Sequence, residues 1–293
     1  MKIIWLVIPA MLCQFGLWAG EKTTFRTYVD SDICARLMLG PISPARTECS
    51  QQTVKDGADL ALVRLLNNMV FSVNKQKMVK PMVGQLAEVA GDWNLKSGTM
   101  KIEGAKPIEA GAIPAGDPDR KLLDAGGGTR AKPETWEKVR HELAMMPYIT
   151  EFDFISFTMV ESQVILTGWT VRETNRSYAF NVVKNLPGVE SVVNNIDVLP
   201  LGSFDMQIRS GARAALQRNL SRYFWGSGSD IKIVVKNGSI ILLGTVATKA
   251  DSDLAYMQCN SVRNAFKVFN MLRVGTSTKK AAPVETQSNK SGA

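Results

Sequence analysis

Apolar residues recur in the same order in two stretches of the second half of the chain. Each stretch begins with a helical pattern, over Pro133 to Met145 and over Asp205 to Tyr223, and Pro133 occupies the favoured first helical position. An alternation of apolar and polar residues follows, which predicts a strand with one apolar face. The apolar residues of this strand are Ile155, Phe157 and Met159 in the first stretch and Ile231, Ile233 and Val235 in the second.

A tight turn and a second strand follow in both stretches. The turn residues are Glu161-Ser162 and Asn237-Gly238, and Asn-Gly is among the strongest short hairpin signals. The second strand ends at Gly168 or Gly244, and a helix with one apolar face and a last strand complete each stretch. The helices are predicted over about Arg172 to Leu186 and Lys249 to Asn264, and the strands over Val192 to Leu199 and Val268 to Val274. Each stretch therefore predicts an αββαβ module.

The two stretches align with each other at an offset of 76 residues, which places Val164 on Ile240. The alignment runs without a gap through the second strand, where Gly168 falls on Gly244, and through the last strand, where Asn194 falls on Asn270. An internal repeat of this kind defines the unit of folding. The second half of the chain is therefore a duplication of one module.

The motifs of the repeat resemble the BON domain. The first copy has Val-x-Leu-x-Gly at the end of the hairpin, as Val164 to Gly168, and Gly188-Val189 before Asn194 and Ile196. The second copy has Asn264-Ala265 where the family has Gly-Val. The resemblance implies two BON modules, residues 133–200 and 203–274, with Gly168, Gly188 and Gly244 as structural glycines. It also implies association with phospholipid surfaces or envelope assemblies and no catalytic residue.

The segment 22–108 has a different pattern, with short β-like runs separated by polar turns. A small β-barrel fits this pattern. Through Asp30 to Cys34, and through Glu48-Cys49, the segment is similar to small exported bacterial domains of OB-like appearance with no established activity. The fold class we predict is α+β: two tandem αββαβ BON-type modules preceded by a small all-β (OB-like barrel) N-terminal domain. The β-like runs are residues 59–66, 69–73, 85–93 and 99–108.

Three further segments are predicted from their composition. Residues 3–19 carry no charge and follow Lys2, which indicates a signal peptide over 1–19; an uncleaved inner-membrane anchor is the alternative. Residues 109–132 are rich in Ala, Gly, Pro and Asp and are expected to be a flexible linker. The polar tail 275–293 is expected to be disordered. The signal pattern predicts an exported protein, located in the periplasm or otherwise associated with the envelope.

The cysteines and the single histidine do not suggest catalysis. Export permits disulfides, and we expect Cys34 to pair with Cys49 and Cys259 to pack as a small buried residue. The cysteine spacing does not match a zinc site. His141 lies among charged residues of a predicted helix, where a solvated face is the expected role. We therefore expect no metal, no cofactor and no enzymatic activity.

Charge differs between the two modules within a chain of net charge +8. Residues 133–200 carry five Lys or Arg and nine Asp or Glu, a net charge of −4, whereas 203–274 carry ten and four, a net charge of +6. One interpretation is that the modules dock on each other or on a neighbouring molecule. The other is that the second module meets acidic lipid or polymer.

Basic and aromatic side chains near the ends of elements are the candidate contact residues. Tyr and Trp suit a membrane interface, although aromatic residues around a small sheet also serve as core or domain-interface packing. In the helix predicted over Asp205 to Tyr223, Arg209 and Arg213 lie on the side opposite Arg218 and Arg222. The candidates are Trp169, Arg209, Arg213, Arg218, Arg222, Tyr223, Phe224 and Trp225.

The predicted function is that of an exported envelope-associated binding protein. It is expected to contact phospholipid surfaces through its BON modules, in envelope maintenance or stress response. The alternative is a protein-protein adaptor in an envelope assembly, with self-association through the charge contrast. Nucleic acid is not an expected partner of the modules; an oligosaccharide or nucleic-acid ligand of the β domain rests on fold analogy alone.

Overall fold

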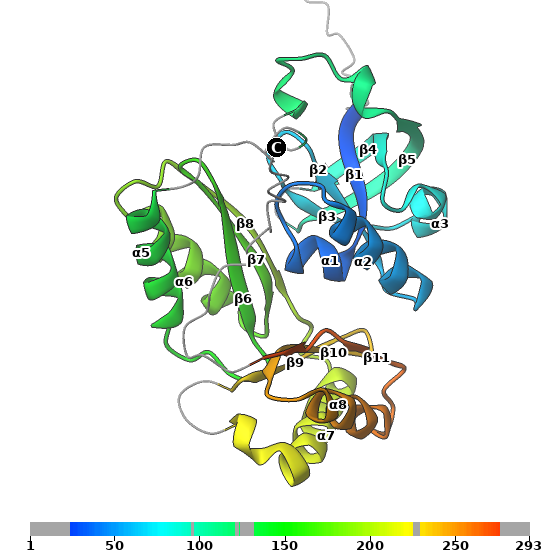
Figure 1. Ribbon diagram of the computed structural model, residues 1–293. Coiled ribbons are helices and arrows are strands. Elements are labelled where there is room, and N and C mark those ends of the chain that lie inside the picture. The colour runs from blue at the N-terminus through cyan, green and yellow to red at the C-terminus, as the bar shows by residue number, and fades with distance from the viewer. Residues whose placement is uncertain (1–23, 95–96, 121–122, 124–131, 225–228, 276–293) are drawn as a thin grey trace, which may run out of the picture.

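The computed structural model describes residues 24–94, 97–120, 123, 132–224 and 229–275. It contains a barrel domain, a first αββαβ module beside it and a second module beneath both (Figure 1). The predicted signal peptide (1–19), residues 276–293 of the predicted tail and Trp225 lie outside the described residues.

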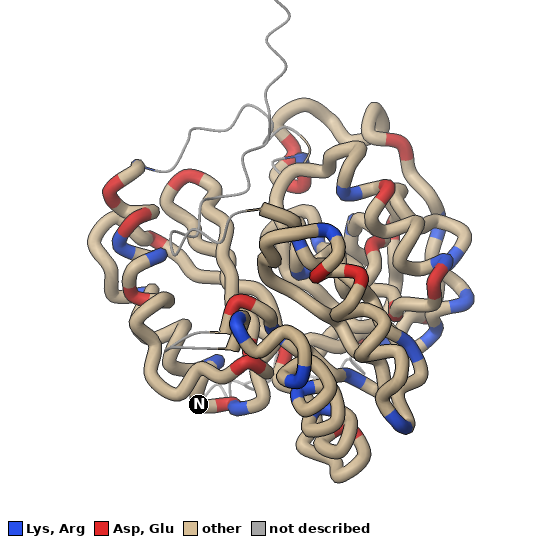
Figure 2. Tube along the Cα trace, turned by 60° about the horizontal axis from the view of Figure 1, so that its bottom comes forward, with Lys and Arg blue, Asp and Glu red and all other residues tan. Residues whose placement is uncertain are grey.

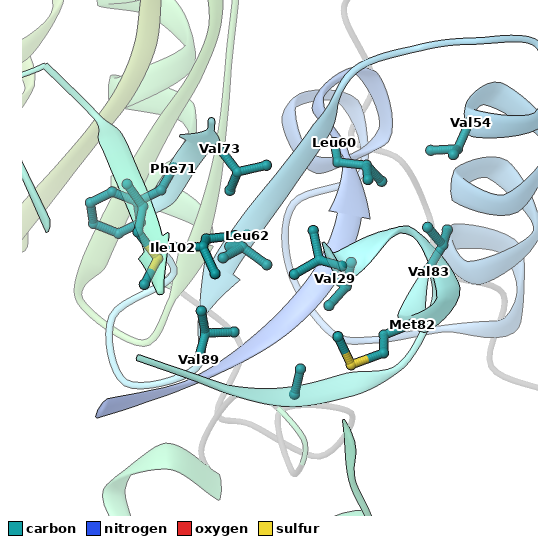
Figure 3. Packing of buried hydrophobic residues seen from close by; sticks show 13 residues of the cluster. Val29, Val54, Leu60, Leu62, Phe71, Val73, Met82, Val83, Val89 and Ile102 are labelled. Carbon is teal, nitrogen blue, oxygen red and sulfur yellow. The ribbon is translucent and has the colours of Figure 1, made fainter. Parts of the chain in front are cut away.

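The N-terminal domain is a closed five-stranded barrel, as predicted. The strand order is β1-β2-β3-β5-β4, and β4 closes on β1. Strands β3 and β5 pair in parallel and the other pairs are antiparallel. Aliphatic side chains and Phe71 fill the interior (Figure 3). The strands are β1 (Thr24–Ser31), β2 (Leu60–Arg64), β3 (Val70–Val73), β4 (Leu86–Asn94) and β5 (Thr99–Ile108).

Helices between the strands add to the predicted all-β domain. Helices α1 (Asp32–Leu37) and α2 (Pro44–Lys55) connect β1 to β2, while α3 (Gln76–Val79) and a 3-10 turn lead from β3 to β4. Serine side chains cap the N-termini of α1 and α2: Ser31 accepts from Cys34 N, and Ser43 accepts from Arg46 N. The domain is therefore a barrel with a helical layer, not purely β.

The first part of the expected linker is folded against the barrel. Residues 110–112 and 118–120 form 3-10 turns, and Ile113 is buried with the outer barrel residues. Arg26 pairs with Asp117 at 2.6 Å and with Asp119 at 3.2 Å. The apolar anchor and these ion pairs hold a segment whose composition alone predicts flexibility.

Both modules have the predicted αββαβ order. In each, the hairpin is antiparallel and the last strand pairs in parallel with the middle one. The first comprises α5 (Pro133–Ala144), β6 (Phe154–Val160), β7 (Gln163–Thr170), α6 (Glu173–Lys184) and β8 (Ser191–Val198). The second comprises α7 (Ser203–Leu220), the 3-10 helix η5 (Ser221–Phe224), β9 (Ile231–Lys236), β10 (Ser239–Val246), α8 (Lys249–Asn260), β11 (Lys267–Asn270) and β12 (Arg273–Val274).

Equivalent residues of the two copies make equivalent contacts. Gly168 and Gly244 have φ values of +115° and +110°, and each faces a carbonyl of the neighbouring strand so closely that a Cβ would lie 1.9 Å from it. Asn194 donates to Arg176 O, and Asn270 donates to Ser252 O, so that the last strand is tied to the second helix in both modules. The repeat thus reflects shared backbone geometry as well as shared sequence.

One face of each module sheet carries the module's own helices, and the opposite face, here called the back face, packs against other domains (Figure 1). The back face of the first module includes Ile165, which packs against the outside of the barrel. Asn195 accepts from Val70 N and donates to Asn68 O, which binds β8 to the barrel. The back face of the second module lies on Ile33 of α1 and on Trp169.

The structure has a disulfide between Cys34 and Cys49, the pair expected from the sequence, and their Cα atoms are 6.1 Å apart. It joins α1 to α2. Cys259 is buried, and burial raises the pKa of its thiol to about 12, which suits a packing role.

Removal of the disulfide in a Cys34→Ala/Cys49→Ala variant is expected to lower the free energy of unfolding by about 3 kcal/mol, because the bond closes a 15-residue loop in the unfolded chain. Urea denaturation without reductant measures this. The wild type with added dithiothreitol should show the same loss; an unchanged midpoint in both would contradict a stabilising role.

Candidate functional site

The three domains meet at an apolar junction under α1. Ile33 of α1, Trp169 of β7, Leu199 after β8 and residues of β9, β10 and β11 form one buried cluster. Trp169 has no exposed surface. The candidate role of Trp169 in membrane contact is therefore wrong: the barrel and the second module cover it, and it acts in domain-interface packing.

A network of charged residues borders this junction, and each of the three domains contributes at least one residue to it. Asp32 pairs with Arg36 at 3.0 Å and with Lys236 of the second module at 2.9 Å. Lys236 also pairs with Asp197 of the first module at 2.7 Å, and Arg36 donates to Asn195 O. Burial by itself raises the pKa of Asp32, but Arg36 and Lys236 outweigh it and hold the pKa well below its usual range. Asp32 therefore stays ionised across physiological pH.

The charge contrast between the modules is partly used within the molecule. Besides the pair of Lys236 and Asp197, Arg213 of α7 pairs with Glu151 at 2.8 Å, and Lys232 donates to Thr150 O. Basic and acidic positions are interspersed along the trace (Figure 2). These contacts agree with the interpretation that the modules dock on each other.

Two more candidates lie in the interior and cannot contact a membrane directly. Arg209 is 2% exposed and donates to Pro200 O and Val235 O. Tyr223 is buried, and its hydroxyl donates to Asp251 and accepts from Ala247 N. Both residues complete the fold of the second module, because their polar groups satisfy backbone and capping groups there.

The remaining described candidates lie nearer the surface. Arg213 and Arg222 are exposed but paired with Glu151 and Asp251. Phe224 is half-buried against the module core. Arg218 is exposed, with no ion pair among the described residues. The structure therefore does not bring the predicted candidates together as one surface.

An exposed aromatic corner of the second module was missed by the sequence reading. The rings of Phe204 and Phe266 lie 5.5 Å apart and are 41% and 70% exposed. Both lie over Gly238, where a Cβ would be 2.5 Å from one ring and 3.1 Å from the other. Beneath them, Asp205 accepts from Asn237 N and Gly238 N, which fixes the hairpin turn. We call Phe204, Phe266 and the turn the aromatic corner.

Two cations lie close to Phe266 in the sequence. Arg263 and Lys267 are both exposed, but the Lys267 ammonium donates to Gly57 O of the barrel domain, which leaves Arg263 as the cation of this segment without such a contact among the described residues. The acidic neighbour Asp205 is buried and bound to the turn. The repeat itself contains the signal for the corner, since Phe266 aligns on Glu190 of the first copy. An apolar residue that replaces a charged one at an exposed position marks a surface with a different task.

The part of the chain that the structure describes contains neither a candidate metal site nor a candidate membrane-spanning helix. No group of three or more His, Cys, Asp or Glu side chains is placed to hold a metal ion there. None of the helices in that part is both long enough and apolar enough to cross a membrane.

The fold defines a multidomain protein in which a duplicated αββαβ unit is docked on a small barrel. Comparison with known proteins assigns the unit: residues 134–200 and 205–276 match the BON domain. This is a BON-domain protein with two tandem copies of the domain.

The individual proteins that this chain resembles have low sequence identity to it. Over 151 residues the chain is 27% identical to the outer membrane lipoprotein DolP of Haemophilus influenzae, with 50% of this chain and 77% of DolP covered. Two structures of CdsD, a structural protein of the type III secretion system of Chlamydia trachomatis, are 12% and 11% identical. They cover 48% and 49% of this chain and 92% and 98% of their own, each with a TM-score of 0.20, which is too low to support an argument about function.

Proposed function

We propose that this chain is an exported, envelope-associated binding protein whose second BON module contacts anionic phospholipid surfaces. The aromatic corner is the observation that carries the proposal. It has two exposed phenyl rings, and the exposed cation Arg263 lies three residues before Phe266 in the chain; this composition suits the boundary between headgroups and acyl chains. The similarity to an outer membrane lipoprotein supports an envelope location.

The arrangement of the domains favours this corner over the other parts of the modules. Both back faces are covered, so the sheets themselves are not available for a flat surface. Arg213, Arg222 and Lys236 of the second module are held in ion pairs within the chain. The contact therefore depends on a small apolar anchor aided by a few cations, and the binding is expected to be reversible.

A Phe204→Ser/Phe266→Ser variant is expected to bind anionic vesicles at least tenfold more weakly than the wild type. Partial burial of two phenyl rings is worth roughly 2–3 kcal/mol in total. Co-sedimentation with vesicles of graded phosphatidylglycerol content measures the loss. The matched control is Met145→Ser/Tyr148→Ser, which removes two exposed apolar residues of the first module and should leave binding unchanged.

The anionic component has its own test. Binding by the wild type should weaken as salt is raised, because exposed cations are screened. If vesicles of no composition bind the full chain, the lipid proposal fails. Salt-dependent self-association in the same samples would then support the adaptor function.

A further inference from the structure

A cavity beside the start of β1 lies far from the aromatic corner in the chain and has no part in the proposed membrane contact. Its volume is about 480 Å³, within the range of small-molecule sites. Strands β1, β2 and β4 and the folded segment 117–119 surround it. Phe25, Leu66 and Pro118 provide apolar wall.

The cations and carboxylates around this cavity are paired with one exception. Arg26 binds Asp117 and Asp119, and Glu88 binds Lys106 at 2.7 Å. Arg64 has no ion pair among the described residues. Its guanidinium instead lies 4.2 Å from the centre of the Phe25 ring.

The position of Arg64 leaves its donors available. A guanidinium has five N–H groups in a planar fork that fits a carboxylate with two parallel hydrogen bonds. Phe25 lies against this guanidinium, and Trp93 packs edge-on against Phe25 with the ring centres 4.3 Å apart. Partial burial lowers the pKa of Arg64, the direction expected for a cation without a close counter-ion, although Asp119 acts in the opposite sense at longer range.

We propose that this cavity binds a small carboxylate with an apolar group, which pairs its carboxylate with Arg64 and packs its apolar part against Phe25, Leu66 and Pro118. A neutral ligand would leave the Arg64 donors unused. A larger polyanion is disfavoured by the carboxylates of Glu88, Asp117 and Asp119 around the cavity. A free fatty acid and the C-terminus of a peptide that ends in an apolar residue share the required chemistry.

The test uses the full chain and isothermal titration with octanoate and with an acetylated dipeptide that ends in leucine. At least one of them should bind saturably, and its amide counterpart at least tenfold more weakly. The preferred probe distinguishes the fatty-acid source from the peptide source. Arg64→Gln should weaken binding at least tenfold, and Arg64→Lys should weaken it less. The control Arg140→Gln, at a partly exposed arginine of the first module, should leave binding unchanged.

A second measurement locates the ligand. Binding should change tryptophan fluorescence in the wild type and should do so much less in Trp93→Phe, because Trp93 contacts the wall of the cavity. Equal binding of acid and amide, or of wild type and a folded Arg64→Gln variant, would overturn the proposal. So would the absence of binding by both acids. None of these outcomes bears on vesicle binding through the second module, so the two proposals fail separately.

Discussion

Replacement of Gly244 by alanine is expected to lower the free energy of unfolding by roughly 3–5 kcal/mol and to destroy the packing of the second module. The φ of this residue is +110°, where a side chain is strained, and the new Cβ would lie 1.9 Å from Asp230 O. That oxygen belongs to the residue before β9 and accepts from Thr245 N, so it cannot move without disturbing the hairpin. Gly168→Ala should have the same effect in the first module, where the oxygen is that of Phe154.

The matched control for both glycines is Gly104→Ala. Gly104 lies in strand β5 and has open space where its Cβ would be. Urea denaturation followed by circular dichroism should place this variant near the wild type. If Gly244→Ala unfolded at the same urea concentration as Gly104→Ala, the close backbone approach would be refuted.

The replacement Arg36→Met should destabilise the chain by about 3–5 kcal/mol, because it removes one partner from a buried charged network. Arg36 is 4% exposed and contacts Asp32, Asp197 and Asn195 O. Its loss leaves two carboxylates with Lys236 as their remaining close cation. Denaturation measures the change in stability, and limited proteolysis should show easier cleavage between the domains.

The exposed pair of Arg140 and Glu137 provides the control, since Arg140→Met is expected to cost less than about 0.5 kcal/mol. The pH dependence supplies a second readout. The folded pKa of Asp32 lies below its unfolded value, so its contribution is complete above about pH 4 and is lost as the pH falls further. Arg36→Met should reduce this acid-induced loss. Equal stability of the two arginine variants would contradict the role of the network.

Features that depend on residues close together in the sequence could be predicted, whereas features that depend on distant contacts could not. The hairpin turn and the glycine near the end of the second strand depend on a few neighbouring residues, and the repeat shows both features in each copy. The strands continue for two residues past Gly168 and Gly244, which the sequence had placed at their ends. Helices α1 and α2 were missed although Ser31 and Ser43 are ordinary capping residues. Their apolar residues show no helical period, because polar side chains are buried there as well: Arg46 of α2 pairs with Asp30 of β1 in the interior.

The candidate site was harder to predict because it depends on contacts between domains. Nothing near Trp169 in the sequence indicates that α1 and the second module cover it. Arg209 resembles a surface arginine in its helix, yet its partners are carbonyls at Pro200 and Val235. Comparison of the two copies position by position would have found Phe266, since the change from Glu190 is visible without a structure.

Because both back faces are covered by other domains, the module that was duplicated is smaller than the part of the chain that is stable as a whole. Duplication of a module produces two copies with identical sheets. Here the two back faces fit different neighbours: Ile165 packs against the barrel, and Ile241 packs against α1 and Trp169. An exchange of the two copies would therefore place each back face against the wrong surface. A module excised alone would expose an apolar sheet to water and tend to aggregate. The stability of each module therefore depends on the neighbour that covers its back face.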